Sequence, residues 1–213
     1  MPSITASWKN PAEHWRHLVA GLWLMLAVCG LARGADIEIR NPQFVAVEDG
    51  YAVTADFGFD FNTRLEEAVT RGVVLYFVVD FELNRPRWYW LDEKVVTRSQ
   101  TIRLSYHALT RQYRLSTGAL HQAFSSLDEA VRMLAHLRNW TVVEKGEKVA
   151  DRGGERMTLR AGEAYQGALR IRLDITQLPK PFQIAAVGSR DWTLASDWKV
   201  WPIVVPAEIK DAR

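Results

Sequence analysis

The residues with the clearest potential for chemistry are tryptophans, which gather in two short stretches. The first is "RPRWYWLDEK" (85–94) and the second is "RDWTLASDWKVWP" (190–202). Indole rings combine a broad apolar surface with a polar edge, and sugars and peptides dock on such rings. The candidate binding residues in these stretches are Arg87, Trp88, Trp90, Trp198 and Trp201.

Burial in the core competes with binding in the first stretch. If this stretch is a strand, Trp88 and Trp90 share one face, while Arg87 and Tyr89 share the other. Because tryptophans are highly buried on average, core packing is the favoured interpretation here, with ligand binding as the alternative.

The second stretch alternates, which predicts a final strand or extended segment. One face is expected to close the core, and its members are Trp192, Leu194, Ser196, Trp198 and Val200. Trp201 falls on the opposite, polar face just before Pro202. Of the three tryptophans in this stretch, it is the one least expected to pack in the core. The open question is therefore whether the Trp201 ring packs against a residue of this chain or contacts a partner.

The sequence contains little evidence for a catalytic motif. Ser196 and Lys199 have the Ser-x-x-Lys spacing of penicillin-binding enzymes, but that chemistry needs a helix, and on a strand the two side chains point to opposite faces. After residue 35 the sequence contains three histidines, His107, His121 and His136. None of them has a second histidine or cysteine at metal-ligand spacing. We therefore expect no enzyme activity, no metal site and no cofactor.

An uncharged segment near the N-terminus indicates export. Leu18–Ala32 is too short for a typical membrane span and matches the apolar core of a signal peptide. Small residues place cleavage after Ala32, or after Gly34 or Ala35. An uncleaved anchor at 18–32 is the alternative, so the protein is expected in the periplasm or held at the inner membrane. Cys29, the only cysteine, lies in this segment.

The expected organisation is a signal peptide or anchor (1–34), one domain (35–205) and a C-terminal tail (206–213). Period-two alternation in "YAVTADFGFDF" and "YQGALRIRLDIT" predicts half-buried strands, and "VVLYFVVDFEL" predicts a central strand. An Asp-Gly turn before Tyr51 predicts a hairpin. The fold class expected is mainly β, an antiparallel, immunoglobulin-like β-sandwich with two short helices.

The two helices are predicted from capping-box spacings. Thr63 and Glu66 would begin one helix, which Gly72 ends, and Ser126 and Glu129 would begin the other. The apolar stripe of the second helix comprises Leu127, Ala130, Val131, Leu134 and Leu137. "EKGEKVADRGGER" (144–156) is expected to be an exposed loop, and "QLPKPFQ" (177–183) a bend.

Four stretches together resemble a known family. They are "GVVLYFVVDFELNRPRWYWLDEKV", "IRLSYHALTRQYRLS", "LPKPFQ" and "DWTLASDWKVW", and they resemble the bacterial exported family catalogued as domain of unknown function 4390. The resemblance runs from about residue 36 to 202. It implies an envelope protein of Gram-negative bacteria, often encoded near a membrane sensor kinase, with no known catalytic residue.

Three functions follow in order of preference. The first is a non-catalytic envelope module that binds a protein, linked to a membrane sensor kinase system. The second is a carbohydrate or peptidoglycan binder that uses Trp88, Trp90, Trp198 and Trp201. An envelope hydrolase comes last. The formal net charge of +2 argues against nucleic acid as a partner, and membrane contact is expected only through the N-terminal segment if it is uncleaved.

Overall fold

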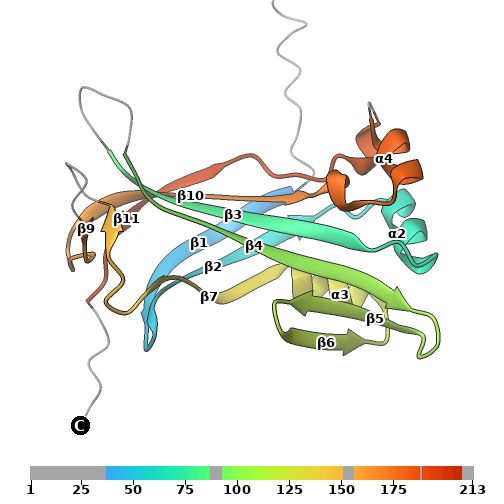
Figure 1. Cartoon of the computed structure of the whole chain (residues 1–213), viewed down its shortest axis with the longest axis horizontal. Coiled ribbons are helices and arrows are strands. Elements are labelled where there is room, and N and C mark those ends of the chain that lie inside the picture. Colours follow the sequence, from blue (N-terminus) through green and yellow to red (C-terminus); the bar gives the residue numbers. More distant parts are fainter. Residues whose placement is uncertain (1–36, 87–92, 151–155, 188, 208–213) are drawn as a thin grey trace, which may run out of the picture. The chain divides into compact units, whose positions relative to one another are not determined.

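A computed structural model describes residues 37–86, 93–150, 156–187 and 189–207. The chain divides between Gly34 and Ala35, and all of these residues belong to the second unit, Ala35–Arg213. This unit is mainly β, as predicted, and consists of two antiparallel sheets with short helices (Figure 1).

The two sheets differ in size. The small sheet has the order β1 (Ile37–Val47), β2 (Gly50–Phe59) and β7 (His136–Glu144). The large sheet has the order β11 (Lys199–Val204), β10 (Ala164–Leu173), β3 (Leu75–Arg85), β4 (Glu93–His107), β5 (Gln112–Thr117) and β6 (Leu120–Phe124). A separate two-stranded ribbon pairs β8 (Val149–Ala150) with β9 (Arg156–Met157).

Aromatic rings join the inner faces of the two sheets. Phe44 of β1 stacks on Phe81 of β3 with ring centroids 6.3 Å apart, and Phe59 of β2 meets Phe77 of β3 edge-on at 5.8 Å. Phe77 and Phe81 are fully buried. The predicted central strand at 73–83 is confirmed, since β3 is paired on both sides within the large sheet.

The predicted hairpin at Asp49–Gly50 is confirmed by the pairing of β1 with β2. Gly50 has a φ of 132°, and a Cβ atom there would lie 2.2 Å from the carbonyl oxygen of Val143. Only glycine fits this conformation next to β7. Gly50 therefore allows β2 to start directly beside β7.

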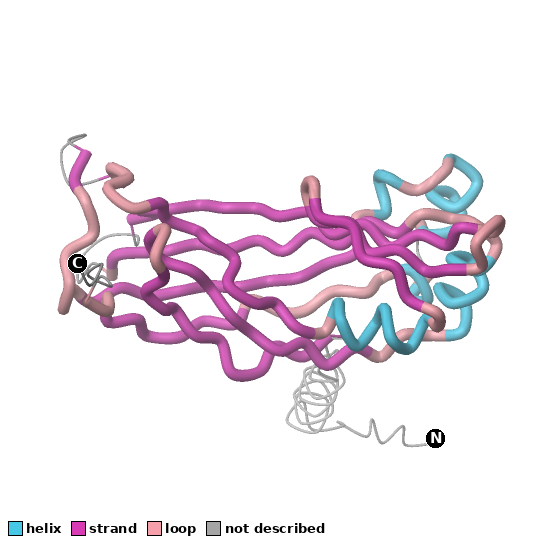
Figure 2. Tube along the Cα trace, turned by 90° about the horizontal axis from the view of Figure 1, so that it is seen from below, coloured by secondary structure: helices cyan, strands magenta, loops and turns pink. Residues whose placement is uncertain are grey.

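The helices of the described chain are α2 (Thr63–Thr70), α3 (Leu127–Leu134) and α4 (Lys180–Ala186), with 3₁₀ turns η1 (Ile175–Gln177) and η2 (Arg190–Trp192). Helices α2 and α4 lie together at one end of the sheets, and α3 lies against β5, β6 and β7 (Figures 1 and 2). None of the helices in the described residues is long and apolar enough to span a membrane.

Several sequence-based expectations about the helices need correction. Asn62, not Thr63, caps α2, because its side-chain oxygen accepts a hydrogen bond from Leu65 N. Ser126 caps α3 as predicted, but α3 ends at Leu134, and Leu137 is buried from strand β7. The capping signals are local, and Leu137 satisfied the helical spacing by coincidence.

The predicted bend at 177–183 is instead occupied by η1 and α4. Pro179 is the N-cap of α4 and Pro181 lies in its first turn, where the missing backbone N–H of a proline costs nothing. Two prolines two residues apart therefore begin this helix and do not prevent it.

The expected loop at 144–156 also contains more structure than predicted. Val149 is buried, and β8 pairs with β9. Residues 151–155 lie outside the described part of the chain. The hairpin β5–β6, which extends the large sheet, had no sequence-based prediction, because its alternation is interrupted by exposed Leu120.

Candidate binding surface on strands β10 and β11

The outer face of the large sheet has a charged centre. Asp80 of β3 accepts a hydrogen bond from the Ser99 hydroxyl at 2.8 Å on one side and is paired with the Arg172 guanidinium at 3.4 Å on the other. Arg170 lies directly opposite Asp80 in the pairing of β10 with β3. Side chains from the two neighbouring strands, β4 and β10, therefore hold this carboxylate in place.

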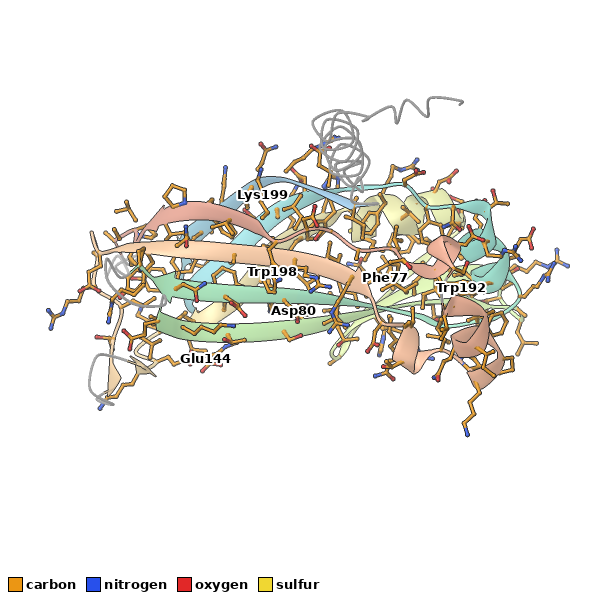
Figure 3. The ribbon with its side chains drawn as sticks, turned by 90° about the horizontal axis from the view of Figure 1, so that it is seen from above. Phe77, Asp80, Glu144, Trp192, Trp198 and Lys199 are labelled. Atoms are coloured by element: carbon orange, nitrogen blue, oxygen red, sulfur yellow. The ribbon has the colours of Figure 1, made fainter. Side chains whose placement is uncertain are left out.

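Trp198 borders this charged centre. It is 41% exposed, and the guanidinium of Arg170 lies over its ring, 5.9 Å from the centroid. A cation over an indole face is an attractive arrangement. Figure 3 looks onto this side of the molecule and labels Trp198, Asp80 and Lys199.

Strand β11 continues the apolar surface from Trp198. Val200 is 49% exposed and Val204 is 66% exposed, and both lie on the side of β11 opposite the buried Ile203. We call Trp198, Val200 and Val204, with Arg170 beside them, the β11 strip. The strip lies at the edge of the large sheet, because β11 is its terminal strand.

The free edge of β11 is poorly suited to pairing with another strand. Val205 donates its N–H to Glu163 O and accepts one from Gly162 N, so it bonds toward β10. Since this direction alternates along a strand, Pro202 stands at a position that faces the free edge. Proline has no N–H to donate, which protects an edge from strand addition. A partner would therefore contact side chains of the strip.

The second tryptophan stretch was predicted to be extended throughout, but its start, Arg190–Trp192, forms η2, and β11 begins at Lys199. Its predicted faces are correct at the start and wrong at the end. Trp192, Leu194 and Ser196 are buried as expected, but Trp198 and Val200 are exposed. Trp201, predicted to lie on the polar face, packs against the core.

A bulge explains this change of face. Ala195 pairs with Arg172, so an unbroken register would place Trp198 opposite Leu169; Lys199 takes that position instead. One extra residue is therefore inserted in this strand, and a shift of one residue exchanges the two faces.

Trp201 has neighbours within its own chain. Its ring is half-buried, lies 6.2 Å from the Phe81 ring and covers Gly167, where a Cβ atom would come within 2.8 Å of the indole. Gly167 thus leaves the space that the Trp201 ring fills. Trp201 packs as a core residue and is not part of the β11 strip.

The other three sequence-based candidates, Arg87, Trp88 and Trp90, lie outside the described residues. Side-chain contacts connect the strands on either side of them, β3 and β4, with each other and with β10. Arg85 is 3.6 Å from the Glu93 carboxylate and donates to the Tyr165 hydroxyl at 3.1 Å. Burial raises the pKa of Tyr165, whose hydroxyl donates to Glu163 at 2.7 Å. These contacts anchor the base of the β3–β4 connection.

Comparison with known proteins gives one match. A family model described as "Domain of unknown function (DUF4390)" matches residues 34–202. The chain belongs to the DUF4390 family. No curated protein and no solved structure matched it.

The DUF4390 match includes Ser196 and Lys199, whose spacing suggested enzyme chemistry. Ser196 is buried, and its hydroxyl oxygen accepts a hydrogen bond from Ile171 N at 3.0 Å, while Lys199 is exposed. The Ser196 N–H also donates to Ile171 O at 2.8 Å. Ser196 thus fastens the chain to β10 just before the bulge.

Replacing Ser196 with alanine is expected to lower the free energy of unfolding by about 1–3 kcal/mol, because the buried Ile171 N–H loses its acceptor. Urea denaturation measures this. Ser105→Ala, which removes a half-buried hydroxyl of β4 that has no hydrogen bond to another described residue, is the matched control and should change stability by less than about 0.5 kcal/mol. Equal stability of the two variants would contradict the assigned role.

The histidine with the most contacts is His136 of β7. Its Nδ1 lies 2.9 Å from Asp56 Oδ1, and Arg138 donates to the same oxygen at 2.6 Å. The hydrogen bond from Arg138, followed by that from His136, lowers the pKa of Asp56 to about 2. This cluster joins β2 to β7. Among the described residues, no group of three potential metal ligands occurs.

A cleft of about 260 Å³ is lined in part by His136 and Arg138 of this cluster and lies between α3, β7 and the strands β4, β5 and β6. Leu115, Leu120 and Met133 line it, together with Gln100, whose Oε1 is buried and has no hydrogen-bond partner among the described residues. Its volume is below that typical of small-molecule sites, roughly 300–1,000 Å³. None of the sequence-based candidates lines it.

Proposed function

We propose that this DUF4390 protein is a non-catalytic module of the bacterial envelope that binds another protein through the β11 strip. The observation that carries the proposal is the row of exposed apolar side chains, Trp198, Val200 and Val204, along a terminal strand. Isolated exposed apolar residues are common on proteins, but a contiguous group beside polar residues is typical of an interaction surface.

The composition of the strip favours a protein partner. Tryptophan and arginine are the residue types most enriched where binding energy concentrates in protein interfaces, and Trp198 lies directly against Arg170. Asp80 and Arg172 provide a charged rim next to them. Because Pro202 obstructs strand addition, the partner would dock on the side chains of the strip.

Export to the envelope and a link to a membrane sensor kinase remain part of this proposal. Their support is the uncharged segment Leu18–Ala32 with the small residues after it, and the neighbourhood that the family resemblance implies. The periplasm is the proposed location, with retention at the inner membrane as the alternative.

We also propose that the fold is an immunoglobulin-like sandwich. In that topology strands A, B and E form one sheet, and G, F, C and C′ form the other. If β1, β2, β3 and β4 are lettered A, B, C and C′, and β7, β10 and β11 are lettered E, F and G, the order β1-β2-β7 corresponds to A-B-E. The order β11-β10-β3-β4 then corresponds to G-F-C-C′. The hairpin β5–β6 would then be an extension of the second sheet.

Carbohydrate or peptidoglycan binding is the second candidate, because the Trp198 ring is partly exposed next to charged groups. It ranks lower for two reasons. Arg170 covers one face of that ring, and Trp201 packs inward and provides no second ring for a platform. Titration of cell-wall fragments while tryptophan fluorescence is followed tests it: a saturable shift, lost in Trp198→Ala, would favour a glycan ligand.

Site-specific photo-crosslinking in cells tests the protein-binding proposal. A photo-crosslinking residue at position 200 or 204, at native expression, is expected to give one discrete adduct with the same protein from both positions. Position 120, exposed on β6 at the opposite edge of the large sheet, is the control and should not give this adduct. An absence of adducts at 200 and 204, or the same adduct from position 120, would overturn the proposal.

A further inference from the structure

The end of the domain that bears α2 and α4 has exposed apolar residues that the β11 strip does not explain. The three most exposed large hydrophobic residues in the described chain are Leu109 at 93%, Val187 at 79% and Ile184 at 77%. Leu109 lies in the turn between β4 and β5, whereas Ile184 and Val187 lie on α4 and at its C-terminus. Both segments lie at this end of the sheets (Figures 1 and 2).

A chain of contacts holds these segments in place. The Phe182 ring of α4 packs edge-on against Trp192 of η2 at 5.6 Å, and the Asn62 side chain donates to Asp191 O at 2.9 Å. At the other end of α2, the hydroxyls of Thr70 and Tyr113 are 3.2 Å apart. The exposed residues are therefore presented by an ordered framework.

The charge of the β4–β5–β6 extension is one-sided. Between Glu93 and Asp128 the sequence contains no acidic residue. Arg103 of β4 and Arg114 of β5 are exposed on the outer face of the large sheet. The residue that follows each of them, Leu104 or Leu115, is buried on the inner face. Arg111 is exposed in the same turn as Leu109.

These three arginines are available to an external anion. Arg103, Arg111 and Arg114 form no ion pair with another described residue, in contrast to Arg64 and Arg71 of α2, which pair with Asp191 and Glu67. Arg111 thus lies two residues from the exposed Leu109, and Arg103 and Arg114 lie on the strands that this turn connects. The acidic residues Glu66 and Glu67 belong to α2, on the other side of Tyr113.

We propose that this end of the domain docks on an anionic lipid surface, with Leu109, Ile184 and Val187 entering the interface and Arg103, Arg111 and Arg114 contacting headgroup phosphates. Clusters of basic residues bind anionic leaflets, and apolar side chains beside them insert at the boundary between headgroups and acyl chains. This contact is separate from any contact made by residues 18–32, and from the β11 strip.

The geometry favours lipid over an acidic protein. The apolar residues project from a turn and from a short helix, with α2 in contact with segments on both sides of it. A protein interface requires one contiguous surface with matching shape, whereas a lipid interface accepts separate projections.

Vesicle sedimentation with residues 35–213 tests the proposal. Every residue of the core cluster lies within this unit, so it carries its own core, and it excludes the apolar segment 18–32 that would bind lipid by itself. We expect binding to vesicles of phosphatidylcholine that contain phosphatidylglycerol, loss of binding at high salt, and little binding to phosphatidylcholine alone.

Two variants and two matched controls measure the contributions. Leu109→Ser is expected to weaken binding at least about ten-fold, and Arg111→Gln with Arg114→Gln about thirty-fold. Val204→Ser on β11 and Arg40→Gln on β1 remove an exposed valine and an exposed, ion-paired arginine elsewhere and should change binding by less than about two-fold. Circular dichroism verifies that each variant is folded.

Fluorescence gives a second readout that does not depend on loss of function. The unit 35–213 has no cysteine, because Cys29 is the only one in the chain, so Leu109→Cys provides a single site for an environment-sensitive dye. A blue shift with the phosphatidylglycerol vesicles is expected. Equal binding to both kinds of vesicle, equal effects of variants and controls, an unchanged dye spectrum, or binding to polyglutamate without binding to vesicles would each overturn the proposal. Crosslinking from positions 200 and 204 is independent of all these outcomes.

Discussion

Replacing Trp198 with alanine is expected to lower the yield of the adduct crosslinked from position 204 by at least about thirty-fold, because truncation of a central tryptophan typically costs about 2 kcal/mol or more of binding energy. The same change also removes the partner of the Arg170 guanidinium, which then returns to water. The free energy of unfolding should fall by no more than about 1–2 kcal/mol, since the ring is 41% exposed and lies outside the buried cluster, and only its contact with Arg170 and its covered part are lost.

The matched control for this prediction is Leu120→Ala. Leu120 is an exposed apolar residue on β6, the strand at the opposite edge of the large sheet. Its truncation should leave the adduct yield unchanged. If both variants lose the adduct equally, or if Trp198→Ala retains it, the β11 strip is not the binding surface. Urea denaturation of each variant separates loss of binding from loss of folded protein.

Replacing Phe81 with alanine is expected to lower the free energy of unfolding by about 3–5 kcal/mol, the largest stability effect predicted for this chain. Phe81 is fully buried at the centre of the large sheet, and its ring contacts both Phe44 of the small sheet and Trp201 of β11. Its truncation would leave a cavity between β3, β1 and β11. Urea denaturation monitored by far-UV circular dichroism measures the change.

A double-mutant cycle between Phe81 and Trp201 shows whether Trp201 acts in packing. If the two rings support each other, the loss in Phe81→Ala with Trp201→Ala should differ from the sum of the single losses by at least about 0.5 kcal/mol. Val204→Ala, on the exposed side of the same strand, is the control and should combine additively with Phe81→Ala. Additive losses for Trp201 as well would contradict the packing role.

The prediction of faces succeeded where it depended only on local alternation. Period-two alternation predicted half-buried strands in β2 and β10, and Tyr51, Val53 and Phe57 of β2 and Leu169 and Ile171 of β10 are buried. The cap at Ser126 was equally predictable, because it depends on residues within one helical turn. At Trp198 the same method failed, because the bulge before β11 is set by pairing with β10, about thirty residues earlier in the chain.

The candidate site was predicted in the same uneven way. Trp198 was identified as a candidate from its residue type, but its exposure and its Arg170 neighbour depend on the fold. The exposure of Val200 and Val204, the unpaired arginines of β4 and β5, and the packing of Trp201 had no signal in the local pattern. The absence of acidic residues between Glu93 and Asp128 was present in the sequence and could have indicated the basic surface.

The sequence by itself determined the β-rich class, the hairpin at Gly50, two of the three described helices and the membership suggested by four long motifs. These properties follow from the period of side-chain alternation and from turn and cap residues, which act within a few positions of the chain. Only the tertiary structure decided which tryptophan is packed and which is exposed. That choice depends on strand order and register: β11 lies at an edge of the large sheet, one inserted residue turns Trp198 outward, and Gly167 of β10 leaves the space that Trp201 fills.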